Sequence, residues 1–125
     1  MLSGRNFSFE ALRATWACTL NIPTVDLAKQ VVGVGNCSGR SVDKFAKFGL
    51  APAPEVDAPR VAECCANLEC RIVDTREVNR CNFFVLEMAK IWVNASVKKP
   101  KTLHHRGNGA FCVAGETLPL RSAMK

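Results

Sequence analysis

The fold of this chain is decided by residues 36–49, which read NCSGRSVDKFAKFG. A polar, glycine-containing turn runs here into a short amphipathic helix, which we expect over residues 41–48. Ser41 is a suitable N-cap, and Gly49 suits the left-handed conformation that ends many helices. A helix capped for stability alone would show this pattern. The same turn also brings backbone N–H groups, hydroxyls and Arg40 to a helix N-terminus, where the helix dipole favours an anion.

The composition is that of an ordinary soluble globular chain, since 48% of the 125 residues are hydrophobic and 22% are charged. We expect one domain over residues 1–125. No apolar run is long enough for a membrane-spanning helix, and the N-terminal sequence MLSGRNFSFE lacks the layout of a signal peptide. The expected location is therefore the cytoplasm, without membrane contact.

The net charge of +6 raises the question of an anionic partner. Lys and Arg are scattered along the chain, and the one local cluster, Lys98, Lys99 and Lys101, stands beside a proline as in a solvated loop. Scattered positive charge suits a small phosphate-bearing cofactor better than a nucleic acid, which usually meets a basic patch or stripe. We expect no nucleic-acid partner.

Seven cysteines are an odd number, and no C-x-x-C motif is present. Cys64 and Cys65 are adjacent and cannot bridge each other with ordinary disulfide geometry. Several cysteines, Cys18 among them, lie in apolar runs, so we expect reduced, buried thiols in a reducing compartment. A zinc site is the alternative, with Cys64, Cys65, Cys70, His104 and His105 as candidate ligands. Its spacing matches no standard zinc pattern, and we expect no metal.

The first half of the chain reads as helix, strand and helix. The pattern predicts helices over residues 7–15 and 24–34, with Thr24 capping the second. Between them, residues 16–22 are typical of a strand that ends at a proline. Three polar residues, Arg5, Asn6 and Ser8, lie at the start of the first helix. This helix start is a second possible anion-binding site. Simple capping is again the alternative.

The second half reads mainly as strands. Residues 51–59 form a proline-rich, extended connection. Residues 68–73 alternate with period two, and residues 83–93 resume in β-type residues after a polar break, which predicts an antiparallel pair. The second run is apolar on both faces, so we expect both faces to be covered, by helices or by another subunit. Residues 95–100 read as a basic loop. Residues 101–109, with two histidines, an arginine and two glycines, form a second polar cluster that is either functional or a surface loop. A strand over residues 110–114 follows.

The sequence offers few groups for catalysis. It contains no nucleophile elbow, Walker loop, H-E-x-x-H motif or evident carboxylate pair, so no catalytic residue is identified. The polar groups that can converge are hydroxyls, amides, Arg and His near helix starts and glycine turns. Such groups bind a phosphate and the polar edge of a ring. Any redox chemistry would need a cofactor, which the protein positions.

Several motifs together resemble the flavin reductase-like, FMN-binding split-barrel family, in particular its flavoredoxin-type members. The motifs are FSFE at 7–10, LNIPT at 20–24, GNCSGRSVDKFAKFGL at 35–50, NLECRIVDT at 67–75, HHRG at 104–107 and VAGETLPL at 113–120. They extend over essentially the whole chain, and the stretch at 35–50 is the most specific. Family members carry further strands upstream of the position that matches Met1, so the chain resembles the C-terminal portion of a family member.

The resemblance implies a mainly β fold with helices, a partial split barrel of antiparallel strands. It implies a homodimer with FMN near the subunit interface, and either reduction of flavin by NAD(P)H or electron transfer through bound FMN. The alternative is a truncated, non-catalytic homologue that persists as a dimerising β-rich protein with weak or no flavin binding.

The family's cofactor residues carry over to three parts of this chain. The first is the loop before the first helix, expected at the phosphate and ribityl chain. The second is the turn that opens the helix at 41–48, expected as the other wall, together with the LNIPT motif. The third is the HHRG motif, expected near the isoalloxazine ring or the nicotinamide. The residues concerned are Ser3, Arg5, Asn6, Ser8, Asn21, Ser38, Gly39, Arg40, Lys44, His105 and Arg106.

Overall fold

The centre of the molecule, seen in a computed structural model that describes residues 2–53 and 58–116, is an antiparallel sheet in the order β1–β4–β5. Its strands are β1 (Ala17–Ile22), β4 (Ala66–Asp74) and β5 (Val85–Val93). Two short strand pairs accompany it, β2 (Pro52–Ala53) with β3 (Arg60–Val61), and β6 (Leu103–Gly107) with β7 (Ala110–Val113). The helical elements are α1 (Phe7–Thr15), η1 (Val25–Leu27), α2 (Ala28–Gly35), α3 (Lys44–Phe48) and α4 (Val78–Cys81).

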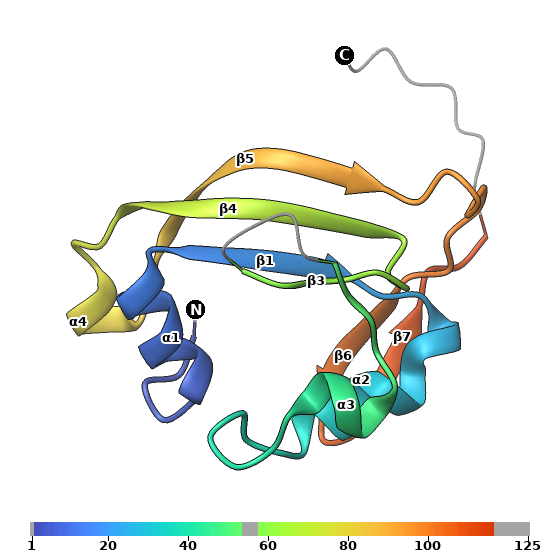
Figure 1. Cartoon of the computed structure of the whole chain (residues 1–125), viewed down its shortest axis with the longest axis horizontal. Coiled ribbons are helices and arrows are strands. Elements are labelled where there is room, and N and C mark those ends of the chain that lie inside the picture. The colour runs from blue at the N-terminus through green and yellow to red at the C-terminus, as the bar shows by residue number, and fades with distance from the viewer. Residues whose placement is uncertain (1, 54–57, 117–125) are drawn as a thin grey trace.

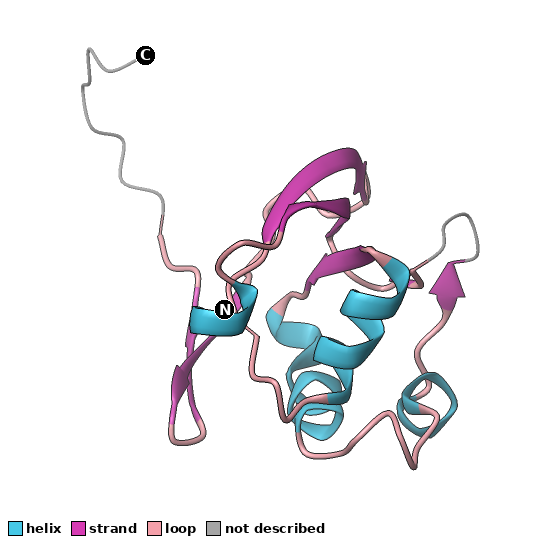
Figure 2. Cartoon of the chain, turned by 90° about the vertical axis from the view of Figure 1, so that its left-hand side faces the viewer, coloured by secondary structure: helices cyan, strands magenta, loops and turns pink. Residues whose placement is uncertain are grey.

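The helices and the β6–β7 hairpin lie on one side of the sheet, beneath its two ends. Figure 1 shows α1 and α4 below one end and α2, α3 and the hairpin below the other. In the perpendicular view of Figure 2, helices again lie below the arched strands. No helix among the described residues is long and apolar enough to cross a membrane.

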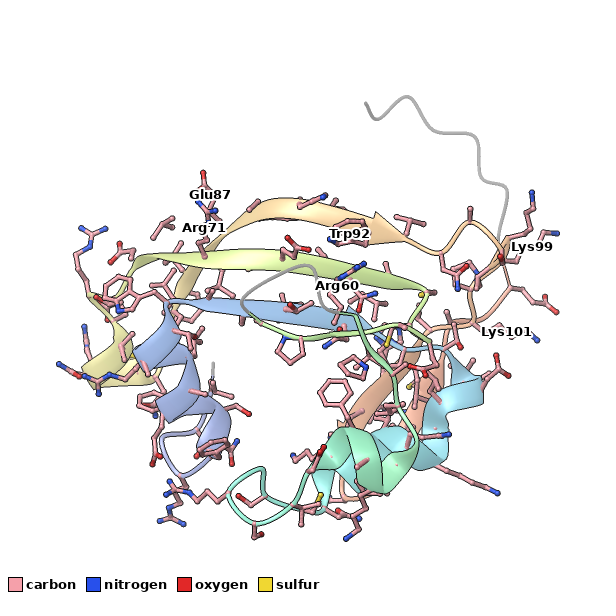
Figure 3. The ribbon with its side chains drawn as sticks, viewed as in Figure 1. Arg60, Arg71, Glu87, Trp92, Lys99 and Lys101 are labelled. Atoms are coloured by element: carbon pink, nitrogen blue, oxygen red, sulfur yellow. The ribbon has the colours of Figure 1, made fainter. Side chains whose placement is uncertain are left out.

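The strand register separates an apolar face of the sheet from a polar one, because directly opposed residues share a face and neighbours along a strand alternate. Leu20 opposes Leu68, which opposes Ile91 on the other side. Arg71 opposes Glu87 on the polar face, and both project away from the helices (Figure 3). The apolar face is therefore the one turned toward the helices. The predicted antiparallel pair is confirmed.

On the polar face, several side chains interact around Trp92 of β5. The Cζ atom of Arg60 lies 3.8 Å from the centroid of its ring, and the Nζ atom of Lys90 lies 3.7 Å from it. The indole N–H donates to the carboxylate of Glu69 on β4. Arg60 comes from β3, so the cluster joins the small β2–β3 pair to the main sheet (Figure 3).

The apolar face is only partly covered by the described residues. On β5, the exposed fractions of Met88, Ile91 and Val93 are 49%, 50% and 70%. The described part of the chain therefore does not cover this strand on both faces, and covering by another subunit stays a prediction. The reason is geometric, since the helices and the hairpin lie under the ends of the sheet and leave the outer strand open.

Helix α1 matches the predicted residues 7–15. It ends because Trp16 takes a left-handed conformation, with φ at 57°, and its N–H donates to the carbonyl of Leu12. The strand after it begins at Ala17, one residue later than predicted, for the same reason.

The predicted helix over residues 24–34 is two elements, the 3-10 turn η1 followed by α2. The hydroxyl of Thr24 donates to the carboxylate of Asp26 at 3.3 Å and makes no cap to the backbone, so the expected cap is wrong. The Leu27 N–H donates to the Thr24 carbonyl at 3.0 Å, three residues back, so the first turn closes as a 3-10 turn and α2 begins only at Ala28.

The helix in the stretch 36–49 begins at Lys44, three residues later than predicted. Asp43 is its N-cap, and its carboxylate accepts from the N–H groups of Phe45 and Ala46 at 2.9 and 3.1 Å. Ser41 instead lies in the preceding turn. The predicted end is confirmed, because Gly49 takes a left-handed conformation with φ at 61°.

Helices α2 and α3 meet at a glycine. A Cβ atom on Gly33 would lie 2.3 Å from the Cε1 atom of Phe48, so only hydrogen fits there. Close by, the ammonium of Lys44 donates to the carbonyl of Val34 at 2.8 Å. This bond closes the C-terminal end of α2 against the start of α3.

The polar residues before the last predicted strand form a strand of their own, β6, so the surface-loop reading of residues 101–109 is wrong for residues 103–107. A hairpin joins β6 to β7 through Gly107, Asn108 and Gly109, which all have positive φ. The strand predicted over 110–114 is confirmed and ends at Val113. In the proline-rich connection, β2 and β3 pair as an antiparallel bridge, whereas residues 54–57 lie outside the described residues.

Candidate functional site

A cleft of about 840 Å³ lies between α1, β1 and the turn that precedes α3. Its walls come from segments far apart in the sequence: the start of α1, the first half of β1, the end of α2 with the turn after it, and the residues just before β3. The polar groups lining it are Arg5, Asn6, Ser8, Thr15, Thr19, Asn36, Ser38 and Lys44. Cys18 and Cys37 also line the cleft.

The first wall is the N-terminal end of α1. Asn6 is its N-cap in an extended conformation and its carbonyl accepts from the Phe9 N–H at 2.9 Å, which leaves the N–H groups of Phe7 and Ser8 without an intrahelical acceptor. A tight turn precedes it, in which the Asn6 N–H donates to the carbonyl of Ser3 at 3.0 Å. The Arg5 N–H donates to the Ser3 hydroxyl at 3.4 Å. Ser3 therefore shapes the loop but lies outside the described lining, whereas Arg5, Asn6 and Ser8 line the cleft.

The second wall is the turn before α3. The Ser38 hydroxyl accepts from the Arg40 N–H at 3.3 Å, and the Ser38 carbonyl accepts from the Ser41 N–H at 3.3 Å. These bonds fold the turn so that Ser38 and Gly39 line the cleft. Lys44 lines it too, half-buried, with one of its three donors held by Val34. Two ammonium donors therefore remain for an acceptor in the cleft.

The two walls touch each other at one side of the cleft. The guanidinium of Arg40 forms an ion pair with Glu10 of α1 and lies 5.7 Å from the ring centroid of Phe7. A Cβ atom on Gly39 would lie 2.9 Å from the Cδ1 atom of Phe7. Glycine at position 39 therefore lets the turn approach α1 closely. Arg40 holds this contact rather than lining the cleft.

The electrostatics of the cleft favour an anion. Arg5 and Lys44 bring two positive charges to its lining, and Asn6 and Ser8, at the positive end of the α1 dipole, line it too. The nearby carboxylate of Glu10 is already paired with Arg40. On the floor of the cleft, burial and the neighbouring Cys70 raise the pKa of the Cys18 thiol, which keeps it neutral.

Three predicted site residues lie elsewhere. The Asn21 side chain accepts from the N–H of Val61 at 3.0 Å and so ties β3 to β1. His105 and Arg106 stand on β6, where the ring of His105 lies 4.9 Å from that of Phe111. None of the three lines the cleft described above.

Reasoning from the sequence missed the floor of the cleft. Cys18 and Thr19 come from β1, and Ala58 and Pro59 come from the segment before β3. The available signal was that β1 follows α1 directly, because a strand that immediately follows a helix tends to pack against it. The approach of residues 58–59 depends on the hydrogen bond from the Thr19 hydroxyl to the carbonyl of Ala58, at 2.9 Å, which has no local signature.

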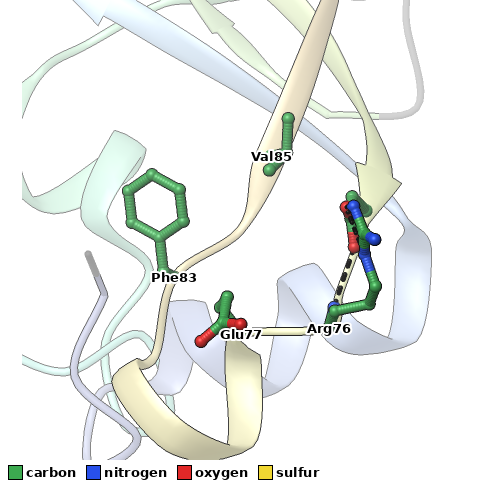
Figure 4. A pocket seen from close by; sticks show the side chains of 5 residues that line it. Arg76, Glu77, Phe83 and Val85 are labelled. Carbon is green, nitrogen blue, oxygen red and sulfur yellow. Dashed lines mark hydrogen bonds and ion pairs between the residues drawn. The ribbon is translucent and has the colours of Figure 1, made fainter.

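Two smaller cavities are less suited to a ligand. One, of about 380 Å³, lies beside Phe83 and Val85 and is shown in Figure 4. There the Arg76 guanidinium donates to the carboxylate of Asp74 at 2.5 and 2.8 Å, so its charge is already paired. The other, of about 300 Å³, lies between Arg13 and Phe84. Among the described residues, no group of three or more His, Cys, Asp or Glu side chains is arranged to hold a metal ion.

The chain belongs to the flavin reductase-like family, because residues 1–112 match the family model described as the flavin reductase like domain. An uncharacterized protein of Archaeoglobus fulgidus is 36% identical over 72 residues, which cover 56% of this chain and 41% of the relative. An uncharacterized protein of Deinococcus radiodurans is 27% identical over 115 residues, which cover 90% of this chain and 46% of the relative. The match thus spans less than half the length of each of these curated relatives.

Solved structures share the fold. The FMN-binding domain of a flavin reductases-like enzyme from Shewanella baltica superposes with a TM-score of 0.86 at 21% identity, covering 96% of this chain and 71% of that chain. Flavoredoxin of Desulfovibrio vulgaris gives a TM-score of 0.82 at 22% identity, covering 98% and 72%. The fold predicted from the sequence, antiparallel strands with short helices in a split-barrel arrangement, is confirmed.

Proposed function

We propose that this chain binds FMN in the cleft between α1 and the turn before α3. The observation that carries the proposal is the convergence of Arg5, Asn6 and Ser8 with Ser38 and Lys44 on one hollow of about 840 Å³. That volume lies within the range of about 300–1,000 Å³ typical of small-ligand pockets. Membership of the flavin reductase-like family supports the choice of a flavin among the possible anions.

The residues present fit the two chemically different parts of FMN. The phosphate is a dianion, and Arg5, the Ser8 hydroxyl and the free N–H groups of α1 are suitable donors for it. The ribityl chain and the ring edge offer hydroxyls, carbonyls and ring nitrogens, for which Ser38, Lys44 and the backbone at Gly39 are suitable partners. Gly39 also lets the turn come close, since a side chain there would collide with Phe7.

Bound FMN would supply the redox chemistry, accepting electrons from one partner and passing them to another. The protein's own residues would fix the position of the flavin and limit its contact with water. Positive charge from Lys44 near the ring would favour the reduced, anionic flavin. We propose NAD(P)H as the electron donor for flavin reduction, with electron transfer from another donor as the second possibility.

The binding proposal is tested by titrating the purified protein with FMN and, in parallel, with riboflavin, following flavin fluorescence. We expect quenching with FMN and clearly weaker binding of riboflavin, because riboflavin lacks the phosphate that Arg5 and α1 would hold. Flavin bands should remain in the visible spectrum after desalting. Absence of both quenching and retained flavin would reject the proposal.

The donor is tested separately, by mixing the FMN-loaded protein with NADH or NADPH and following loss of the nicotinamide absorbance. Turnover with either nucleotide supports a reductase. Bound FMN that neither nucleotide reduces, but that dithionite reduces, would leave electron transfer as the function.

Self-association and location complete the proposal. The open apolar face of β5, with Met88, Ile91 and Val93 about half exposed or more, supports a dimer in which this face is covered. All seven cysteines are free thiols, which supports a reducing compartment such as the cytoplasm.

A further inference from the structure

Two cysteines lie side by side on neighbouring strands next to the cleft, and one of them, Cys18, lines it. Cys18 on β1 and Cys70 on β4 are directly opposed in the antiparallel register, so their side chains share one face of the sheet. Directly opposed residues in such a pair have Cα atoms about 4.5–5.5 Å apart, within the 4.4–6.8 Å that a disulfide spans. The backbone therefore already holds this pair at bridging distance.

The two thiols differ in their access to solvent. Cys18 is half-buried and lines the cleft, so a small reagent that enters the cleft can reach it. Cys70 has only 5% of its surface exposed and lies behind it. This is the arrangement of an attacking thiol with a second thiol poised to react with its oxidised form.

The other cysteines are less suited to pairing. Cys64 and Cys65 are neighbours in sequence, where an ordinary disulfide is not accessible. Cys37 lines the opposite wall of the cleft, and its thiol points to the carbonyl of Val34 at 3.8 Å. Neither Cys37 nor Cys112 on β7 has a cysteine as its strand partner, since residue 37 lies outside the strands and Cys112 opposes His104.

We propose that Cys18 and Cys70 are a redox-active dithiol, which peroxides entering the cleft oxidise to a cross-strand disulfide. The Cys18 thiolate attacks one peroxide oxygen, the O–O bond breaks, and Cys18 becomes a sulfenic acid while the other oxygen leaves as water after taking up a proton. The sulfur of Cys70 then attacks the sulfur of Cys18, the S–O bond breaks, and a second water leaves. Two thiols and one hydrogen peroxide thus give one disulfide and two waters, and thiol reductants reverse the change.

The reaction is expected to be slow at neutral pH. Burial and the neighbouring Cys70 raise the pKa of Cys18, and burial raises that of Cys70, so the reactive thiolate is scarce. Hydrogen peroxide in excess, rather than a stoichiometric amount, is therefore the appropriate probe. The inference goes beyond FMN binding and is tested on the protein without added flavin.

The experiment is a disulfide map of the reduced protein after treatment with hydrogen peroxide and blocking of the remaining thiols. Trypsin releases Cys18 in the peptide 14–29, and a Glu-specific protease separates Cys70 from Cys64 and Cys65 by cutting after Glu63 and Glu69. We expect an intramolecular link between Cys18 and Cys70, two fewer free thiols than the seven of the reduced chain, and full recovery with dithiothreitol.

Variants establish the order of the steps. Cys70→Ser should trap Cys18 as a sulfenic acid that reacts with dimedone, and Cys18→Ser should leave Cys70 as a free thiol. Cys112→Ser is the matched control and should keep the link. The proposal is overturned if the wild-type map shows Cys18 linked to Cys37, or a Cys18–Cys70 link only between two chains. It is equally overturned if Cys18 and Cys70 both remain free while Cys81 is oxidised.

Discussion

At the scale of single residues, Arg5 and Arg40 carry the same charge but stand in different surroundings. Arg40 is paired with Glu10 and lies over the ring of Phe7, so its guanidinium is engaged within the protein. Arg5 lines the cleft and offers its charge to whatever enters. Although the sequence places Arg40 in the more specific motif, the structure makes Arg5 the better candidate for holding a phosphate.

Replacing Arg5 by glutamine should weaken FMN binding about tenfold, the lower end of what a charge-assisted hydrogen bond contributes, because the side chain is exposed. Riboflavin binding should not change, since riboflavin has no phosphate. Both affinities are measured by fluorescence titration. Arg13→Gln, at the other end of α1, is the control and should leave both affinities unchanged. An equal loss for the two flavins would show that Arg5 acts on the fold and not on the phosphate.

Cys64 offers a second test at this scale. Burial, with the neighbouring Cys65 and Glu63, raises its pKa to about 11, so at neutral pH it is a protonated, enclosed thiol. We expect iodoacetamide to label Cys64 far more slowly than the exposed Cys81 in the folded protein, as followed by peptide mass spectrometry. In urea the two rates should become similar. The unfolding free energy should fall as pH rises from about 9 toward 11, because the unfolded chain loses this proton first.

At the scale of elements, the contact between α2 and α3 depends on the missing side chain at Gly33. Gly33→Ala places a Cβ atom 2.3 Å from the ring of Phe48, which forces the helices apart and should cost about 1–3 kcal/mol of unfolding free energy. Gly35→Ala is the matched control, since nothing lies within 4 Å of a Cβ atom there. The control should be neutral or slightly stabilising. Urea denaturation measures both, and equal midpoints would contradict the close approach.

The elements that sequence reasoning predicted well are those whose signals are local. Helix α1 has both a periodic apolar face and a cap residue, and its bounds were predicted. The start of α3 was not, because Ser41 and Asp43 are both good caps and only the backbone conformation decides between them. Strand β6 was not predicted, because its exposed residues are two histidines and an arginine, which carry no strand signal.

The residues that line the cleft were predicted in part. Their grouping rested on the family resemblance rather than on a local signal. That residues 3–8 and 36–44 belong to one site followed from the family resemblance and not from any spacing, because thirty residues separate Arg40 from its partner Glu10. Asn21 was predicted to bind the cofactor because it lies in the LNIPT motif. In the structure its side-chain oxygen accepts from the Val61 N–H. Contacts between distant segments are set by tertiary packing, so a local pattern does not reveal them.

At the scale of the whole molecule, the open face of β5 bears on association. If this face meets a second chain, Ile91→Ser should weaken the dimer at least several-fold in sedimentation velocity, because buried apolar area drives association. Glu87→Ser, on the polar face of the same strand, is the control and should leave the dissociation constant unchanged. A wild-type chain that stays monomeric at all concentrations would remove the dimer from the proposed function.

The ion pair between Arg40 and Glu10 has a consequence for how the cleft responds to its medium. Both side chains are about half exposed, so dissolved ions screen their attraction, over a distance of about 8 Å at physiological ionic strength. The packing of Phe7 against Gly39 is apolar and insensitive to salt. Raising the ionic strength should therefore loosen the rim on the Arg40 side while the Phe7 contact persists as a pivot. The contact between the two walls should therefore depend more on Phe7 and Gly39 in concentrated salt than in dilute buffer.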